Sequence, residues 1–220
     1  MEGAIVVTGA SGSLGSAVCE RLAKDGGRIV ALVHREPARA ALVERLGNRV
    51  QVLLAELSSE ESVEAAFDAA GEIHAAVNCA GGWEGGRKLA ETPLATFEQM
   101  IAVNLRSSFL VARAAARRRA RRVVLVAAAN AASLTGLSGS AAYYAAKAGV
   151  IALAKALSEE GVRCACVAPG MMRTSRNEKA MPRADSSRWV TVEQVAEAIA
   201  FLCDPRSEGV DGAVLTLPSR

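Results

Sequence analysis

Tyr143 and Lys147 are the two residues whose types and spacing most directly indicate chemistry. They lie four positions apart near the start of a predicted helix, so both side chains project from one face of it. An ammonium beside a phenol favours the phenolate, and we expect Lys147 to lower the pKa of Tyr143 from its ordinary value of about 10. Such a phenol suits proton transfer near neutral pH. Taken alone, the spacing also fits an ordinary helix surface.

A glycine-rich turn follows the first predicted strand and reads Thr8-Gly9-Ala10-Ser11-Gly12-Ser13-Leu14-Gly15. Glycine lets the backbone turn tightly and approach a pyrophosphate, and the helix that begins at Ser13 directs its free N–H groups at the phosphates. A second segment of small residues, Asn78-Cys79-Ala80-Gly81-Gly82, closes the fourth predicted strand and leaves room for the adenosine side of a dinucleotide. The cofactor contacts expected from these segments are Gly9, Ser11, Ser13, Leu14, Gly15, Asn78, Ala80 and Gly81.

The end of the second predicted strand bears on the choice between NAD(H) and NADP(H). An acidic residue there would bind the ribose hydroxyls and favour NAD(H), but the chain reads Val33-His34-Arg35. Arg35 could pair with a 2′-phosphate through its bidentate guanidinium. We therefore expect His34 and Arg35 to contact the cofactor, and NADP(H) to be favoured over NAD(H). The alternative is that Arg35 is a solvated surface charge.

Short apolar runs alternate with longer helical stretches along the chain. Runs without polar alternation are typical of strands covered on both faces, as in a parallel sheet. With right-handed crossovers, the pattern predicts a single α/β domain over residues 1–220, with a Rossmann-type doubly wound parallel sheet of seven strands. The expected strands are Ala4–Thr8, Arg28–Val33, Val50–Leu54, Ile73–Val77, Val123–Val126, Arg163–Val167 and Ala213–Leu217, and the expected helices are about Ser13–Lys24, Pro37–Leu46, Ser59–Ala69, Thr96–Arg118, Ala141–Glu160 and Val192–Leu202.

Two local features refine this picture. The spacing of Ser58 and Glu61 predicts a capping box at the start of the third helix. The stretch of about 171–190 is long and irregular, and it follows the sixth strand, at the carboxyl edge of the sheet where ligands bind. We expect it to be a lid or a mobile segment, since long loops in compact domains usually have that role.

Composition argues against several other classes of protein. The net charge of +3 is too small to indicate a nucleic-acid partner, and 4% aromatic residues leave no platform for stacking bases. The basic run 117–122 is expected to be a solvated helix end, with nucleic-acid contact as the alternative. No apolar run approaches the about 20 residues of a membrane span, and MEGAIVVTGA shows no leader peptide. We expect a cytoplasmic protein with scattered, reduced cysteines and no metal site.

These motifs together resemble the short-chain dehydrogenase/reductase family along essentially the whole chain. Further matches are Asn104 in Val103-Asn104-Leu105, and Pro169-Gly170 followed by Thr174. The resemblance implies an NAD(P)-dependent oxidoreductase in which Tyr143 donates the proton and Lys147 also bonds the nicotinamide ribose. It further implies that Asn104 holds a water in the proton relay, that Thr174 lies near the carboxamide, and that Pro169 and Gly170 also contact the cofactor.

The chain departs from the family pattern at two places. Ser13 stands where the turn usually has its middle glycine, with Gly12 displaced by one position. Counting back from Tyr143, the family's catalytic serine falls on Asn130, whose amide could still donate a hydrogen bond to the substrate. We therefore expect Asn130 to act as a catalytic residue and substrate contact, with Ser133 or Ser138 as substitutes.

The dihydropteridine reductase branch of the family works without that serine, and two stretches of this chain are similar to it. One is Gly81-Gly82-Trp83-Glu84-Gly85-Gly86, and the other is the lid sequence of residues 177–189. Trp83 could stack on a flat heterocycle, or else pack under the lid. An electron-poor quinonoid ring accepts hydride readily and needs less polarisation than a ketone carbonyl. The loss of the serine would therefore slow its reduction less. The branch has an aspartate where this chain has His34, which indicates a different cofactor preference or substrate.

The expected function is therefore reduction of a quinonoid dihydropterin-like or other flat conjugated small molecule by hydride transfer. Two alternatives stay open. One is a general carbonyl or quinone reductase with Asn130 in place of serine, and the other is a non-catalytic NADP(H)-binding sensor. The resemblance also implies a homodimer or homotetramer paired through the helices at about Thr96–Arg118 and Ala141–Glu160. Neither nucleic acid nor membrane is an expected partner.

Overall fold

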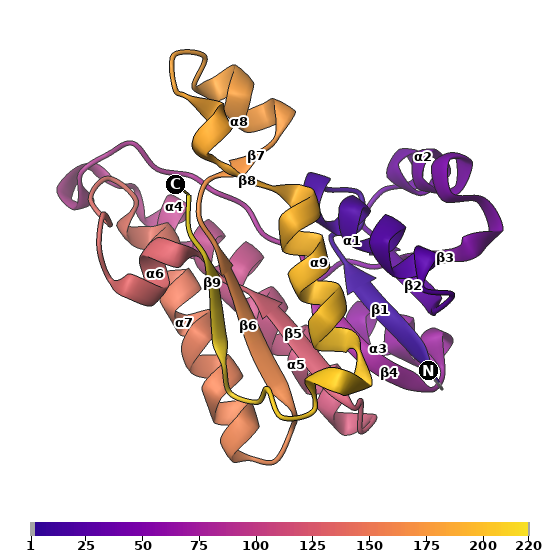
Figure 1. Cartoon of the computed structure of the whole chain (residues 1–220). Helices are drawn as coiled ribbons and strands as arrows, with labels where there is room; N and C mark the ends of the chain where they lie inside the picture. The colour runs from indigo at the N-terminus through magenta and orange to yellow at the C-terminus, as the bar shows by residue number, and fades with distance from the viewer. Residues whose placement is uncertain (1–2, 220) are drawn as a thin grey trace.

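Runs of Val, Ile, Leu and Ala build the central sheet of the computed structural model, which describes residues 3–219. Within these residues seven parallel strands pair in the order β3-β2-β1-β4-β5-β6-β9 (Figure 1). The strands are β1 (Ala4–Thr8), β2 (Arg28–Val33), β3 (Val50–Leu54), β4 (Ile73–Asn78), β5 (Arg122–Val126), β6 (Cys164–Pro169) and β9 (Val214–Leu217). The first three have the predicted bounds; β4, β5 and β9 differ by one residue at one end, and β6 differs by one residue at its start and two at its end. The leader-peptide expectation rests partly on Met1 and Glu2, which lie outside the described residues.

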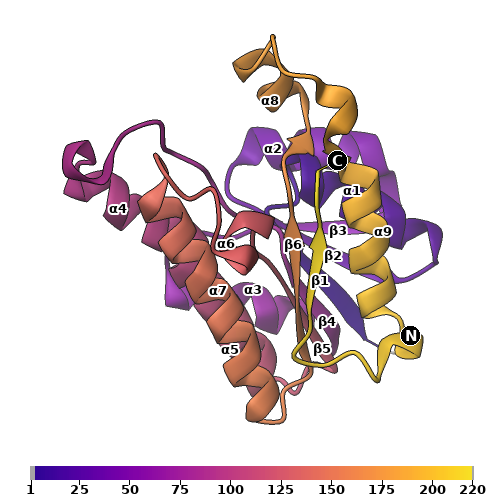
Figure 2. The same ribbon diagram turned by 60° about the vertical axis from the view of Figure 1, so that its left-hand side comes forward.

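Helices cover both faces of the sheet, as a doubly wound Rossmann fold requires (Figure 2). One face carries α1 (Ser13–Lys24), α2 (Glu36–Leu46) and α9 (Val192–Cys203), and the other carries α3 (Glu60–Ala70), α5 (Ser107–Arg117) and α7 (Ala141–Glu159). Successive strand residues point to opposite faces, so in β1 the side chains of Ile5 and Val7 join one core, and those of Ala4 and Val6 join the other. The single α/β domain predicted from the sequence is confirmed.

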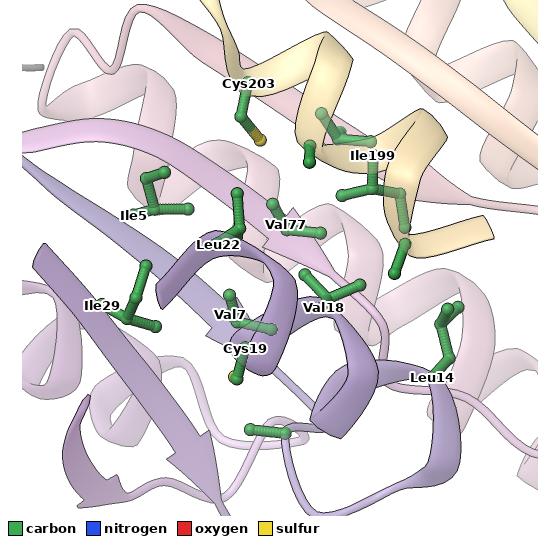
Figure 3. Close-up of a cluster of buried hydrophobic side chains, with 14 of the residues drawn as sticks. Ile5, Val7, Leu14, Val18, Cys19, Leu22, Ile29, Val77, Ile199 and Cys203 are labelled. Carbon is green, nitrogen blue, oxygen red and sulfur yellow. The ribbon is translucent and has the colours of Figure 1, made fainter. Parts of the chain in front are cut away.

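The core between α1, α9 and the sheet fixes the position of the glycine turn. Val18 and Leu22 on α1, Ile199 on α9 and Ile5 on β1 are almost fully buried and belong to one core cluster (Figure 3). Because α1 is held against β1 in this way, its amino end stays at the carboxyl end of that strand.

The long helix predicted over Thr96–Arg118 is divided into three parts. Helix α4 (Leu94–Met100) begins directly after Pro93 and leads into a π-helical turn, η3 (Ile101–Arg106), before α5 starts. The side-chain amide of Asn104 donates to the Met100 carbonyl oxygen at 3.1 Å, and the hydroxyl of Ser108 donates to the Asn104 carbonyl oxygen at 2.6 Å. Side chains that bond backbone carbonyls in this way compete with regular helical bonding, and periodicity does not report them.

The segment expected to be an irregular lid has its own secondary structure. It contains β7 (Met172–Arg173), α8 (Ser175–Ala180), the 3₁₀ turn η4 (Ser186–Arg188) and β8 (Val190–Thr191), which pairs with β7. It stands above the carboxyl ends of the strands, at the top of Figure 1. Helix α6 (Ala129–Ser133) and the 3₁₀ turns η1 (Gly47–Arg49), η2 (Leu89–Glu91) and η5 (Pro205–Ser207) were also not predicted.

The capping box predicted from Ser58 and Glu61 is wrong. The hydroxyl of Ser59 accepts from the Ser62 backbone N–H and caps α3, while Ser58 bonds the Glu56 carboxylate instead. A complete capping box forms at Thr191 and Gln194, where the lid enters α9.

The cysteines are free thiols: Cys19, Cys164, Cys166 and Cys203 are buried and Cys79 is half-buried. Burial raises the pKa of each, to about 12 for Cys19, Cys164, Cys166 and Cys203. Among residues 3–219, no group of three or more His, Cys, Asp or Glu side chains is placed to hold a metal ion. No helix in that part of the chain is both long and apolar enough to cross a bilayer.

Phe67 on α3 should be essential to the core beneath α3 and α5, because its side chain is 0% exposed. Phe67→Ala leaves a cavity and should lower the free energy of unfolding by about 3–5 kcal/mol. Phe201→Ala is the matched control, since Phe201 is 46% exposed on α9. Denaturant unfolding of both variants measures the difference, and equal losses would contradict this view of the core.

Candidate functional site

Gly9 and Gly15 bring the glycine turn and the loop after β4 into backbone contact. Gly9 has a φ of +63°, and a Cβ on it would lie 2.7 Å from both N and Cα of Ala80. A Cβ on Gly15 would overlap the carbonyl oxygen of Gly9. Ser11 and Ser13 are exposed at the amino end of α1. The turn thus offers bare backbone and a helix amino end, which fits a dinucleotide pyrophosphate.

A chain of side-chain hydrogen bonds braces this edge of the sheet. The hydroxyl of Thr8 at the end of β1 donates to Oδ1 of Asn78 at the end of β4. Nδ2 of Asn78 donates to the hydroxyl of Ser108 at 2.8 Å, and Ser108 donates to the carbonyl oxygen of Asn104. Asn78 is 1% exposed, so its side chain connects β1 and β4 to α5. The sequence analysis did not identify Thr8 and Ser108 as site residues. The available signal was a hydroxyl side chain at the end of β1 and another in the first turn of α5.

Asn104 holds the loop that follows β4. Its Oδ1 accepts from the Gly82 backbone N–H at 3.2 Å, and its Nδ2 donates to the Gly82 carbonyl oxygen at 3.0 Å. A Cβ on Gly81 would lie 2.8 Å from Oδ1 of Asn104 and 3.3 Å from Nζ of Lys147. The structure therefore brings Gly81, Asn104 and Lys147 together, as the sequence motifs suggested.

Tyr143 and Lys147 leave α7 on the same side, as predicted from their spacing. Nζ of Lys147 donates to the carbonyl oxygen of Val126 at 2.8 Å, and it lies 5.9 Å from the centre of the Tyr143 ring. Tyr144 meets Tyr143 edge to face, with the ring centres 5.1 Å apart. Because Val126 ends β5, this pair sits at the carboxyl edge of the sheet, on the same edge as the glycine turn.

The direction expected for the pKa of Tyr143 is wrong. Burial, with a smaller contribution from Tyr144, raises the pKa of Tyr143 to about 12. Burial also lowers the pKa of Lys147 to about 8, although Cys166 and Cys79 act in the opposite direction. The ammonium is directed to the Val126 carbonyl oxygen, and desolvation of the phenol is the main cause of the raised pKa of Tyr143. Tyr143 is therefore a protonated phenol at neutral pH, which is the form that donates a proton.

Asn130 lies on the short helix α6, which packs against α7. Its Nδ2 donates to the carbonyl oxygen of Thr135 at 3.0 Å, so one amide hydrogen serves its own loop. Ser133 and Thr135 are exposed and join their hydroxyls at 2.7 Å, while Ser138 is exposed without a recorded side-chain bond among residues 3–219. Asn130 therefore contributes less free donor capacity than the sequence suggested.

Trp83 is 56% exposed, and its indole N–H donates to the hydroxyl of Ser140 at 3.3 Å. Ser140 directly precedes α7, three positions before Tyr143. The alternative that Trp83 is packed under the lid is therefore wrong. The indole stands at the entrance to α7, where an aromatic face is accessible.

The remaining candidates also lie at carboxyl strand ends. His34 and Arg35 are both exposed after β2, and Arg35 precedes the first residue of α2. Pro169 ends β6, and the Gly170 N–H donates to the Leu217 carbonyl oxygen at 2.8 Å. The hydroxyl of Thr174 caps α8 by accepting from the Asn177 N–H at 3.1 Å. The predicted site residues thus lie at or just beyond the carboxyl ends of the strands, and Thr174 lies within the lid segment itself.

The chain matches, over residues 9–217, the model of a protein family described as enoyl-(acyl carrier protein) reductase. Curated proteins match over nearly their full length. 3beta-hydroxysteroid dehydrogenase 2 of Eggerthella lenta is 29% identical and is aligned over 96% of this chain and 92% of its own. 2-(R)-hydroxypropyl-CoM dehydrogenase of Xanthobacter autotrophicus is 31% identical, over 96% and 95%. 3-Oxoacyl-acyl-carrier-protein reductase of Vibrio cholerae is 30% identical, over 98% and 96%.

Solved structures share the fold. A short-chain type dehydrogenase/reductase from Mycobacterium ulcerans superposes with a TM-score of 0.91 at 23% identity, covering 100% of this chain and 89% of its own. An oxidoreductase of the short-chain dehydrogenase/reductase family from Burkholderia thailandensis superposes with a TM-score of 0.87 at 27% identity, covering 100% and 92%.

Gly15→Ala should weaken dinucleotide binding at least about tenfold, because the new Cβ would overlap the Gly9 carbonyl oxygen and open the turn. Gly209→Ala is the control, since a Cβ there meets no atom within 4 Å. Titration calorimetry with NADPH and NADH measures both. Equal affinities in the two variants would show that the turn does not hold the cofactor.

Tyr143 should titrate far above an ordinary tyrosine. The chain has 2 tyrosines, so Tyr144→Phe leaves only the phenol of interest, whose pKa we expect to stay well above about 10. Since folding raises this pKa, its contribution to stability is present below pH 10 and is lost as the pH rises toward about 12. Phenolate absorbance against pH measures it, and a transition at or below pH 10 in the folded protein would refute the expected burial effect.

Proposed function

Since the chain belongs to the short-chain dehydrogenase/reductase family and is an NAD(P)-dependent oxidoreductase of that type, we propose that it reduces a flat, conjugated substrate of the quinonoid dihydropterin class. Tyr143 serves as the proton donor in this proposal. The observation that carries it is the protonated phenol of Tyr143 beside buried Lys147 at the edge that also holds the glycine turn.

The hydrogen bond from the Asn130 amide to its own loop supports the proposal of a substrate that accepts hydride readily. A ketone needs a donor that polarises its carbonyl group, and a hydroxyl normally provides it in this family. Here one amide hydrogen of Asn130 is directed to Thr135, and no hydroxyl stands at that position. A quinonoid ring needs less polarisation. The exposed indole of Trp83 at the start of α7 supplies a surface on which such a ring could stack.

The chain's own residues divide the work of the reaction as follows. A bound nicotinamide supplies the hydride. The phosphates would be held by Gly9, Ser11, Ser13, Leu14 and Gly15, and the adenosine ribose by His34 and Arg35. The rest of the adenosine would contact Asn78, Ala80 and Gly81. The carboxamide side would contact Pro169, Gly170 and Thr174. The phenol oxygen of Tyr143 carries the proton that reduction consumes. Lys147, anchored on the Val126 carbonyl oxygen, presents its Nζ beside Gly81 for a ribose hydroxyl. Asn104 orients the loop that carries Gly81 and Trp83.

NADP(H) is the cofactor that we propose over NAD(H). Arg35 is exposed at the end of β2 and makes no ion pair with the residues that the structure describes. No carboxylate follows β2 directly to bind a ribose diol. We further propose a cytoplasmic homodimer or homotetramer paired through α4–α5 and α7.

A general carbonyl reductase is the second candidate function. Two of the relatives reported above are named as a hydroxysteroid dehydrogenase and an oxoacyl reductase, and both names refer to conversion between a hydroxyl and a carbonyl group. The exposed hydroxyls of Ser133 and Thr135, one turn from Asn130, could replace the missing serine.

The two functions are separated by a substrate panel. Purified protein with NADPH should reduce quinonoid dihydropterin faster than it reduces simple ketones. Reduction of ketones without any reduction of the pterin would establish the carbonyl reductase. Absence of NADPH oxidation with every substrate would leave a dinucleotide-binding sensor. The same assays with NADH measure the cofactor preference.

Tyr143→Phe should lower kcat by at least about 10²-fold, since the variant cannot donate a proton from that position. Tyr144→Phe is the matched control and should keep kcat within a few-fold, because phenylalanine keeps the edge-to-face ring contact with Tyr143. Steady-state rates with the best substrate of the panel test this. Full activity of Tyr143→Phe would remove Tyr143 from the mechanism.

A further inference from the structure

The basic run of residues 117–122, expected to be a solvated helix end, is divided between different environments. Arg117 and Arg118 reach across to α3, where both bond Glu64 and Arg118 also bonds Asp68. Arg118 in addition donates to the Ala114 carbonyl oxygen at 3.0 Å, in the last turn of α5. These two arginines therefore neutralise the carboxylates beside the helix end, whereas Arg119 and Arg121 make no ion pair in the part of the chain that the structure describes.

Arg122 is a buried cation at the start of β5, with only 4% of its surface exposed. Its guanidinium donates to the carbonyl oxygens of Val210 at 2.5 Å and Ser207 at 2.8 Å. No carboxylate in residues 3–219 pairs with it. A buried charge that bonds only neutral carbonyl groups lacks a counter-charge, and an anion beside it would be stabilised.

Arg119 adopts a backbone conformation that usually belongs to glycine. Its φ is +54°, and it stands directly after the helix cap Arg118. The N–H of Arg119 donates to the Ala116 carbonyl oxygen, and the N–H of Ala120 donates to the Ala115 carbonyl oxygen, both at 3.0 Å. This is the Schellman pattern, in which the left-handed position is most often glycine. Non-glycine residues held in such a conformation cost free energy, and they cluster at ligand-binding and switch sites.

Arg119, Arg121 and Arg122 line one cleft of about 470 Å³. Arg163, Glu208 and Asp204 also line it. Arg163 pairs with Glu208 at 2.9 Å, and Asp204 pairs with Arg206 at 2.8 Å, so these carboxylates are already neutralised. Arg119 and Arg121 make no ion pair within residues 3–219. The cleft therefore holds three uncompensated guanidinium groups, while the formal net charge of the whole chain is +3.

We propose that this cleft binds a small multivalent oxyanion, such as a diphosphate, a triphosphate or a phosphorylated small molecule. Guanidinium groups bind phosphate oxygens in bidentate fashion, and the cleft volume lies in the range of small-molecule sites. Arg122 forms the fixed base of the site, and Arg119 and Arg121 close on the anion from the loop after α5. The cleft lies at the amino ends of β5 and β6, on the edge of the sheet opposite Tyr143, so it is separate from the hydride-transfer site.

Calorimetric titration with pyrophosphate and with tripolyphosphate at constant ionic strength tests the proposal. The double variant Arg119→Gln/Arg121→Gln should bind at least about tenfold more weakly than the unaltered protein, since each charge-assisted hydrogen bond has that order of effect. Arg49→Gln/Lys88→Gln is the control: it removes the same charge from two exposed positions outside the cleft and should keep the affinity. Unchanged affinity of the first variant would assign the anion to the glycine turn and overturn the proposal, as would an equal loss in the control.

Arg119→Gly gives an independent test. Glycine accepts the left-handed conformation, so the variant should have a higher midpoint of thermal unfolding and a weaker affinity for pyrophosphate. A variant that unfolds at higher temperature and still binds pyrophosphate as tightly as the unaltered protein would exclude Arg119 as a ligand. Duplex DNA is the remaining probe. Tight DNA binding that is lost in Arg119→Gln/Arg121→Gln would reassign the cleft to a polynucleotide and overturn the small-anion proposal.

Discussion

The close contact between the backbones of Gly9 and Ala80 is the constraint on which the rest of the site depends. Any Cβ at Gly9 would lie 2.7 Å from Ala80, so the turn after β1 and the loop after β4 can meet only because a glycine is there. The hydrogen-bonded chain from Thr8 through Asn78 and Ser108 keeps the two strand ends in register beneath this contact. Displacement of the glycine turn would therefore also displace the loop after β4, and the reverse holds as well.

That same chain connects the two halves of the site. Ser108 bonds the carbonyl oxygen of Asn104, and the side chain of Asn104 bonds both backbone groups of Gly82. The π-helical turn places Asn104 so that its amide reaches the loop while its backbone stays in the helix. The end of β1, the loop after β4 and helices α4 and α5 are therefore connected by one chain of hydrogen bonds. The amino edge of the sheet, with its three guanidinium groups, lies at the other end of the strands.

The sequence predicted the parts of this molecule that depend on periodicity and on glycine. Strands β1, β2 and β3 and helix α1 have the expected bounds, because buried strands and a helix after a glycine turn leave local signals. Three features depend on individual side-chain bonds to backbone groups, which the hydrophobic pattern does not encode. They are the break at Asn104, the helix α8 inside the lid and the capping of α3 by Ser59 rather than Ser58. The pKa of Tyr143 is raised rather than lowered, because burial of the phenol dominates. Burial depends on tertiary packing, whereas the spacing to Lys147 shows only that the two side chains are close.

For the quinone-like substrate class that we propose, the raised pKa values of the cysteines have a consequence. Such compounds are electrophiles that add to thiolates, and thiols react with them far more slowly. Cys79 is the first residue of the loop after β4, and burial raises the pKa of its thiol, so its sulfur stays protonated. Cys166, on the strand next to Lys147, has a pKa of about 12 for the same reason. Under the proposed function, these protonated thiols would add to a quinone-like substrate far more slowly than thiolates would.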